Sequence, residues 1–170
     1  MTETATSKPI NCVPAAEGET LWFNQALMEV KSPGAWSDGA FSLVEVAMER
    51  GRATGLHSDP SDETFYVLDG ELLIHVEGEA QRRVGTGAAV GIRAGVPHAF
   101  MAVSDVTRFL VLNTPGTHDG FFRDGGHPAA SRDFADAPPP DFDRTAASSE
   151  RHGVRLLGPA PFDDVRIQSG

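Results

Sequence analysis

The stretch "GRATGLHSDPSDETFYVLDG", residues 51–70, places one histidine and two acidic residues close together: His57, Asp59 and Glu63. Side chains two apart on a strand point to the same face, so His57 and Asp59 are expected to share one. Pro60 favours an extended backbone at Asp59, which helps to hold that arrangement. Glu63 follows a short loop at the start of the next predicted strand. The stretch therefore predicts a metal site built on neighbouring strands.

Apolar segments on both sides of this stretch have the length and composition of β-strands. Turn signals separate them about every 8 to 12 residues, which is typical of an antiparallel sandwich or barrel. Asp69-Gly70 and Ser104-Asp105 predict hairpin turns. The strand-like segments are "LWFNQALMEV" (21–30), "AFSLVEVAMERG" (40–51), "TFYVLDGELLIHVEG" (64–78), "RRVGTGAAVGIRAGVPHAF" (82–100) and "MAVSDVTRFLVLNTPG" (101–116).

The chain divides into three predicted parts. Residues 1–18 are polar and predict a flexible N-terminal arm, and residues 19–115 predict the barrel. Residues 116–170 predict a C-terminal extension with short helices that pack on the barrel. One helix is expected within 117–126, and a second begins after Asp141 as N-cap and ends before Gly153.

Composition excludes several classes of protein. The 170-residue chain carries a formal net charge of -10, so nucleic acid is not an expected partner. No apolar run reaches the roughly 20 residues of a membrane helix, and the N-terminus lacks a signal-peptide pattern, so we expect a cytoplasmic protein. Cys12 is the only cysteine, which excludes an intrachain disulfide and a zinc site made of thiolates.

A fourth candidate ligand lies far along the chain. His98 follows the tight turn "AGVP" and begins another predicted strand. A small barrel can direct such residues from several strands at one interior point. The remaining histidines lie mid-strand, in loops or at a helix end, and we interpret them as structural or exposed: His75, His118, His127 and His152.

These spacings resemble the two motifs of the cupin superfamily. Residues 51–70 read G-x5-H-x-D-x3-E-x6-G, where the family has G-x5-H-x-H-x3,4-E-x6-G, so Asp59 replaces a histidine. Residues 87–98 match the second motif, G-x5-P-x-G-x2-H, at Gly87, Gly95 and His98, with Arg93 in place of the proline. The flanking sequence is similar to bacterial quercetin 2,3-dioxygenase-like cupins. The resemblance implies an all-β fold with a single cupin barrel (a double-stranded β-helix or jelly roll) and a short C-terminal helical segment.

The resemblance also implies one divalent transition metal per chain, held by His57, Glu63 and His98 with Asp59 in the fourth place. Two imidazoles and two carboxylates favour Fe(II) or Mn(II), while nickel, cobalt or zinc also suit such a site. Three arrangements stay open. In the first, Asp59 is a metal ligand. In the second, Asp59 orients His57 or a water molecule. In the third, His57, Asp59 and His98 form a facial triad, and Arg108 binds 2-oxoglutarate.

The function that the resemblance implies is a quercetinase-like, metal-dependent dioxygenase, and we expect it to act on a small enolic, phenolic or polyketide-like compound of secondary metabolism. Glu63 would take the substrate proton, and Phe65, Val67 and Phe100 would line an apolar pocket. A redox-neutral cyclase, lyase or isomerase and a non-catalytic small-molecule-binding cupin are the alternatives. The apolar first strands, with Trp22 and Phe23, and the family resemblance predict a homodimer.

Overall fold

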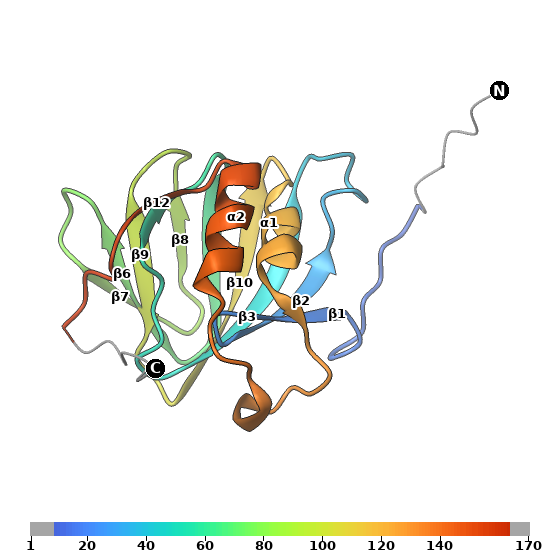
Figure 1. Cartoon of the computed structure of the whole chain (residues 1–170), viewed down its shortest axis with the longest axis horizontal. Coiled ribbons are helices and arrows are strands. Elements are labelled where there is room, and N and C mark those ends of the chain that lie inside the picture. The colour runs from blue at the N-terminus through green and yellow to red at the C-terminus, as the bar shows by residue number, and fades with distance from the viewer. Residues whose placement is uncertain (1–8, 164–170) are drawn as a thin grey trace.

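Two antiparallel sheets enclose the interior of the protein, as a computed structural model of residues 9–163 shows (Figure 1). The larger sheet has the order β11-β1-β2-β3-β10-β5-β8 and the smaller one β12-β4-β9-β6-β7. The larger sheet consists of β1 (Glu19–Phe23), β2 (Ala26–Ser32), β3 (Ser42–Glu49), β5 (Asp62–Asp69), β8 (Ala89–Ile92), β10 (Val106–Thr114) and β11 (His127–Pro128). The smaller sheet consists of β4 (Leu56–Ser58), β6 (Glu71–Val76), β7 (Arg82–Gly85), β9 (His98–Ala102) and β12 (Arg155–Gly158).

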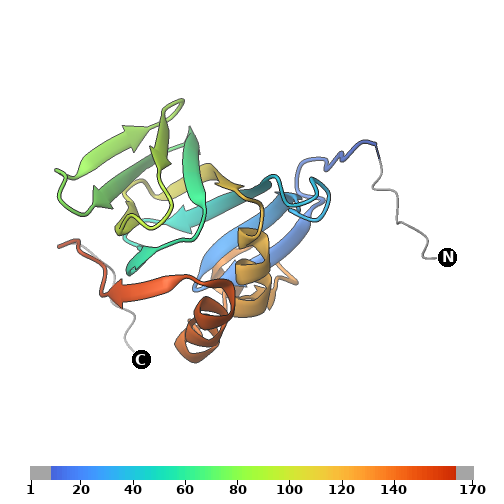
Figure 2. The same ribbon diagram turned by 90° about the horizontal axis from the view of Figure 1, so that it is seen from above.

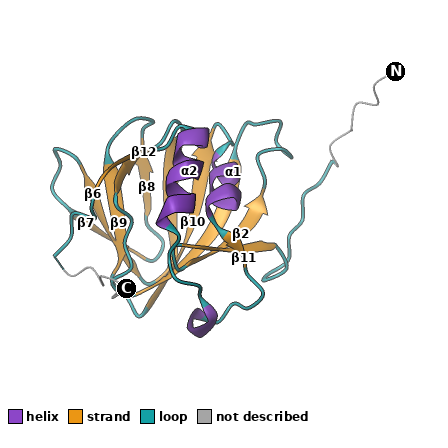
Figure 3. Ribbon diagram, viewed as in Figure 1, coloured by secondary structure: helices purple, strands orange, loops and turns teal. Residues whose placement is uncertain are grey.

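Alternating burial along the central strands explains why the two sheets face each other. In β3 every second residue is buried, and in β10 the buried residues include Phe109 and Val111. The register places Phe109 opposite Val46 and Val111 opposite Val44, so the apolar faces of both strands coincide. The all-β expectation is confirmed, and Figure 3 shows how strands dominate the body of the molecule.

Both predicted hairpin turns are turns, but neither joins two paired strands. Gly70 alone separates β5 from β6, and these strands belong to different sheets. Gly70 has φ of +81°, a conformation that glycine adopts without steric cost. The turn after β9 likewise leads from the smaller sheet to β10 in the larger one. The sequence therefore predicts the local reversal correctly, whereas the pairing partners are chosen by closure of the barrel.

The C-terminal extension contributes two helices that pack side by side (Figure 2). Helix α1 spans His118–Gly125 and α2 spans Phe142–His152. The predicted caps of α2 are confirmed: Asp141 accepts a hydrogen bond from the backbone of Arg144, and Gly153 takes the left-handed conformation. The extension also adds β11 and β12 to the edges of the two sheets and a short 3-10 helix at Phe134–Asp136, which the sequence did not predict.

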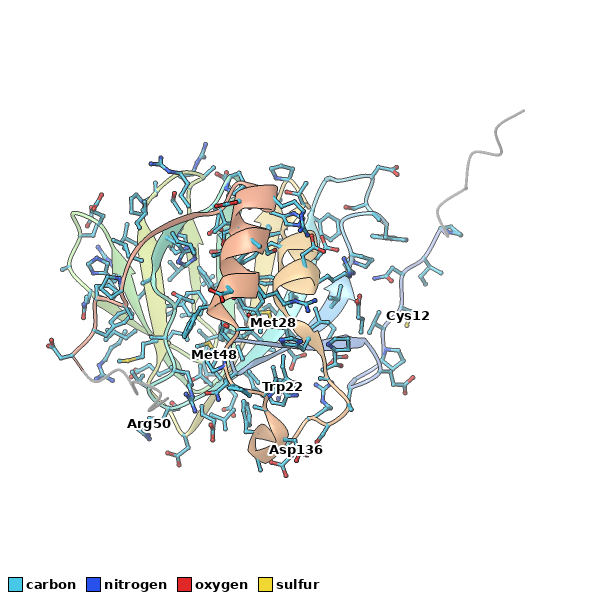
Figure 4. All side chains as sticks on the ribbon, in the orientation of Figure 1. Cys12, Trp22, Met28, Met48, Arg50 and Asp136 are labelled. Carbon is cyan, nitrogen blue, oxygen red and sulfur yellow. The ribbon has the colours of Figure 1, made fainter. Side chains whose placement is uncertain are left out.

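Trp22 and Phe23 are covered by residues of the same chain. Trp22, labelled in Figure 4, is 3% exposed and packs edge-on against Phe134. Phe23 packs edge-on against two phenylalanines of α1. Cys12 is exposed on the N-terminal segment. Within residues 9–163, no helix is long and apolar enough to cross a membrane.

Candidate metal centre

Four side chains from both sheets and the loop between them meet inside the barrel. His57 lies in β4, Asp59 one residue past its end, Glu63 in β5 and His98 in β9. One potential ligand atom of each lies within 4.8 Å of those of the other three. Two atoms bound to one divalent ion at about 2 Å lie at most about 4 Å apart, so the four atoms need to move inward only slightly to bind one ion. The four residues that the sequence singled out as ligands are therefore together, and we call them the metal cluster.

The backbone holds the two motifs against each other. His57 and His98 are direct partners of β4 and β9, and their ring centroids are 4.4 Å apart. The amide of Gly95, in the turn before His98, donates a 2.8 Å hydrogen bond to the carbonyl of Asp59. The φ of Gly95 is +78°, so this turn suits glycine. The position of each histidine is thus fixed by strand pairing and by the turn that precedes β9.

Both histidines direct Nε2 toward the cluster. His57 Nδ1 is 2.8 Å from the carbonyl of Gly55, and His98 Nδ1 is 2.9 Å from the carbonyl of Val96. A carbonyl only accepts, so each Nδ1 carries a hydrogen. Nε2 binds a metal ion when the ring is neutral, and it donates to a carboxylate when the ring is protonated. This pattern of outer contacts is typical of histidines that bind metal.

The carboxylates fill the space between the imidazoles. Asp59 Oδ2 lies 3.5 Å from His57 Nε2 and 3.6 Å from His98 Nε2. Glu63 Oε2 accepts a 3.0 Å hydrogen bond from His98 Nε2. The other Glu63 oxygen, Oε1, accepts a 3.2 Å hydrogen bond from Asn113, which also contacts Ser61.

Burial and charge move the pKa values of the cluster in different directions. Burial raises the pKa of Asp59, and the charge of Glu63 raises it further. Burial also opposes the charge of Glu63, but the hydrogen bond from His98 and the nearby imidazoles outweigh it and lower the Glu63 pKa. Burial lowers the pKa of His57, with a further contribution from His98. For His98, the effect of burial is outweighed by Glu63, which raises the pKa.

The residues present fit a divalent metal ion. Both oxygens of Asp59 are buried and have no hydrogen-bond partner among the described residues. An unpartnered buried carboxylate is costly, and an ion bound at Oδ2 would remove that cost. Two carboxylates also neutralise the charge of a divalent ion, and mixed nitrogen and oxygen ligands suit Fe(II) or Mn(II).

Two residues of this site were missed by sequence reasoning. Asn113 is fully buried near the end of β10, where the register places it opposite Glu63. His118 begins α1, is 4% exposed, and places Nε2 at 3.6 Å from Asp59 Oδ1 and 4.0 Å from Glu63 Oε1. Their position in the sequence is the signal that could have found them. The end of β10 pairs with the start of β5, where Glu63 lies, and α1 follows β10 directly, so both residues come to the same end of the barrel.

The predicted pocket residues lie below the cluster in the interior. Phe65 is fully buried, and its ring centroid is 6.5 Å from that of His98 and 5.1 Å from that of Phe100. Val67 is fully buried two residues further along β5. His57 is the most exposed member of the cluster, with 13% of its side chain accessible against 2–5% for the others. His57 is therefore the member of the cluster most accessible to solvent.

Arg108 lies outside this site. The hairpin predicted at Ser104-Asp105 would pair β9 with β10, but the two strands belong to different sheets, so this pairing does not form. Arg108 instead pairs with Ala47 and Asp69 and forms a 2.6 Å ion pair with Glu45. Its charge is already matched by Glu45, so the structure gives no support to a 2-oxoglutarate site at Arg108.

Comparisons with known proteins agree with the motifs. A family model described as "Cupin domain" matches residues 44–113. The chain is 30% identical over 100 residues to an uncharacterized protein of Streptomyces coelicolor, SCO3923, and covers 92% of that protein and 52% of its own length. The chain belongs to the cupin superfamily.

Two further likenesses are weaker in sequence identity. It is 25% identical over 160 residues to quercetin 2,3-dioxygenase of Bacillus subtilis, which is 91% of this cupin but 47% of that enzyme. The cupin thus spans about half the length of the dioxygenase. An RmlC-like cupin from Shewanella frigidimarina has a TM-score of 0.54 at 14% identity, over 63% of this chain and 93% of that one, a likeness of fold alone.

Proposed function

We propose that this cupin is a metal-dependent dioxygenase that acts on a small enolic or phenolic compound. The observation that carries the proposal is the metal cluster, in which two imidazoles and two carboxylates meet in the barrel interior. The similarity to quercetin 2,3-dioxygenase, which extends over 91% of the chain, supports this choice of reaction.

In this proposal His57, Asp59, Glu63 and His98 hold one Fe(II) or Mn(II) ion. The bound metal would acidify a hydroxyl of the substrate and provide a site for dioxygen. His57 and His98 bind through Nε2, since each Nδ1 faces a backbone carbonyl. Asp59 Oδ2 lies between both imidazoles and completes the set.

Glu63 is the residue that we propose to receive the substrate proton. The hydrogen bond from His98 and the nearby imidazoles lower its pKa, so Glu63 is ionised at neutral pH. A weak base is sufficient when the hydroxyl has been made acidic by the metal. Phe65 and Phe100 lie beneath the cluster and keep water from it on that side.

Oxygen consumption tests the proposal. Protein loaded with Fe(II) or Mn(II) would be mixed with quercetin and with simpler phenols and enols, and dissolved oxygen followed with an electrode. The proposal predicts uptake of one dioxygen per substrate consumed and loss of uptake in Glu63→Gln, with Glu79→Gln, an exposed carboxylate, as control. Substrate conversion at an unchanged rate under argon would instead assign this cupin to redox-neutral chemistry.

A further inference from the structure

His118 of α1 contacts the metal cluster from outside both cupin motifs. Its Nε2 atom lies 3.6 Å from Asp59 Oδ1 and 4.0 Å from Glu63 Oε1. These are the oxygens that point away from the other imidazoles: His57 and His98 are nearest to Asp59 Oδ2, and His98 binds Glu63 Oε2. Each carboxylate therefore has an inner oxygen toward the imidazoles of the cluster and an outer oxygen toward His118.

The two outer oxygens differ in their partners. Glu63 Oε1 is held by a hydrogen bond from Asn113 at 3.2 Å. Asp59 Oδ1 is buried and has no hydrogen-bond partner among the described residues, and His118 Nε2 faces it slightly beyond hydrogen-bond distance. A carboxylate that binds metal through one oxygen is commonly fixed by a donor at the other.

The packing of α1 keeps the His118 ring at this position. The ring packs against Phe121 and Phe122, with centroid distances of 5.0 and 4.7 Å. The first turn of α1 is anchored at Asp119, which contacts the backbone amide of Gly34 and the side chain of Arg123. Ser148 of α2 donates a 2.9 Å hydrogen bond to the carbonyl of Phe121. The extension thus supplies a rigid support for one imidazole.

We propose that His118 is a positioning residue for Asp59: Nε2–H donates to Oδ1 and thereby keeps Oδ2 directed at the metal ion. Asp59 is shorter than the histidine of the family motif, so its direction depends more on an outer contact. This inference rests on the metal centre of the proposed function, but not on the dioxygenase reaction.

Metal affinity, measured by competition with a chelator, tests whether His118 positions Asp59. We expect His118→Leu, which keeps an apolar side chain among the phenylalanines, to bind Mn(II) about 10- to 100-fold more weakly than the wild type. His118→Gln keeps an N–H donor at a similar reach and should restore most of the affinity. In a double variant with Asp59→Ala, His118→Leu should weaken Mn(II) binding little beyond the effect of Asp59→Ala alone. Equal affinity in His118→Leu and wild type, or additive losses in the double variant, would overturn the role of His118, whereas a wild type that binds no metal would overturn the centre itself.

A measurement on the unaltered chain covers the case in which His118→Leu does not fold. Protein with 15N-labelled histidine and bound 113Cd(II) would be studied by NMR for metal–nitrogen coupling. We expect coupling to two imidazoles only, those of His57 and His98. Coupling to a third imidazole, assigned by its loss in His118→Gln, would make His118 a ligand and overturn the positioning role.

Discussion

His98 Nε2 donates to Glu63 Oε2 at 3.0 Å, although the two residues belong to different sheets. The contact joins the two cupin motifs across the interior of the barrel. The same nitrogen cannot both donate this hydrogen bond and bind a metal ion. Metal binding would therefore replace the His98–Glu63 contact by contacts of both residues with the ion, so we expect the loss of His98 to weaken metal binding most.

His98→Ala should abolish stable metal binding. The substitution removes a ligand and also leaves Glu63 without its strongest partner. Metal content after gel filtration, measured by mass spectrometry, should fall from about one ion per chain to a trace. His127→Ala, at a half-exposed histidine outside the cluster, is the control. Full occupancy in His98→Ala would remove His98 from the ligand set.

Asp59→His should change which metal this cupin prefers. The variant restores the histidine of the family motif and removes one of two carboxylates, so the site becomes softer and less negative. We expect affinity for Ni(II) and Co(II) to rise relative to Mn(II), while Asp59→Ala weakens binding of all three. Competition between metals, read by calorimetry, measures the ratio. An unchanged ratio in Asp59→His would show that Asp59 does not touch the ion.

Glu29→Gln should destabilise the fold in a manner that depends on pH. Glu29 is 2% exposed, and although burial opposes its charge, hydrogen bonds from Lys31, Gly18 and Arg132 lower its pKa. A carboxyl group whose pKa is lower in the folded than in the unfolded protein stabilises the fold at pH values above its unfolded-state pKa. This stabilisation is lost as the pH falls through the folded-state pKa. We expect a loss of about 2 kcal/mol at pH 7.

Urea unfolding at a series of pH values measures this effect. The difference between Glu29→Gln and wild type should shrink as the pH falls below the ordinary value of 4.5. Glu17→Gln, at an exposed position, should match the wild type throughout. A difference that grows toward low pH would contradict the assigned sign.

Arg108→Ala should leave metal content and oxygen uptake unchanged. Arg108 is paired with Glu45 and takes no part in the cluster. Only a modest loss of stability is expected from this half-exposed ion pair. The oxygen-electrode assay, run with and without 2-oxoglutarate, checks this. A requirement for 2-oxoglutarate that disappears in Arg108→Ala would restore the sequence-based alternative.

We also propose that the cupin forms a homodimer, on the basis of its family. Trp22 and Phe23 no longer argue for it, because both pack against their own chain. Analytical ultracentrifugation at micromolar concentration should give twice the chain mass of 18.1 kDa. A single species at the mass of one chain would contradict the proposal.

The sequence predicts what local spacing controls. Neighbouring residues determine the i, i+2 relation of His57 and Asp59, the strand that follows them and the caps of α2. Each of these features is present in the structure. Pairing between distant strands is different. The turn signal at Ser104-Asp105 is the same whether the next strand pairs with the last or crosses to the other sheet, so the predicted pairing of β9 with β10 does not form.

Two residues near the metal cluster were not predicted from the sequence, for the same reason. His118 and Asn113 have ordinary neighbours in sequence, and their role depends on the pairing of β10 with β5, which brings Asn113 opposite Glu63. No motif of short range contains them. Long-range register, combined with the packing of α1 on the barrel, was needed to place them beside the metal cluster.

The central claim is that His57, Asp59, Glu63 and His98 hold one metal ion. A crystal structure of the Mn(II)-loaded protein, with anomalous diffraction to locate the ion, tests it most directly. We predict one anomalous peak per chain within the cluster, with Nε2 of both histidines and an Asp59 oxygen at about 2.0 to 2.2 Å. Metal-loaded crystals with no anomalous peak in the cluster, or with the Asp59 carboxylate turned away from the ion, would contradict the claim.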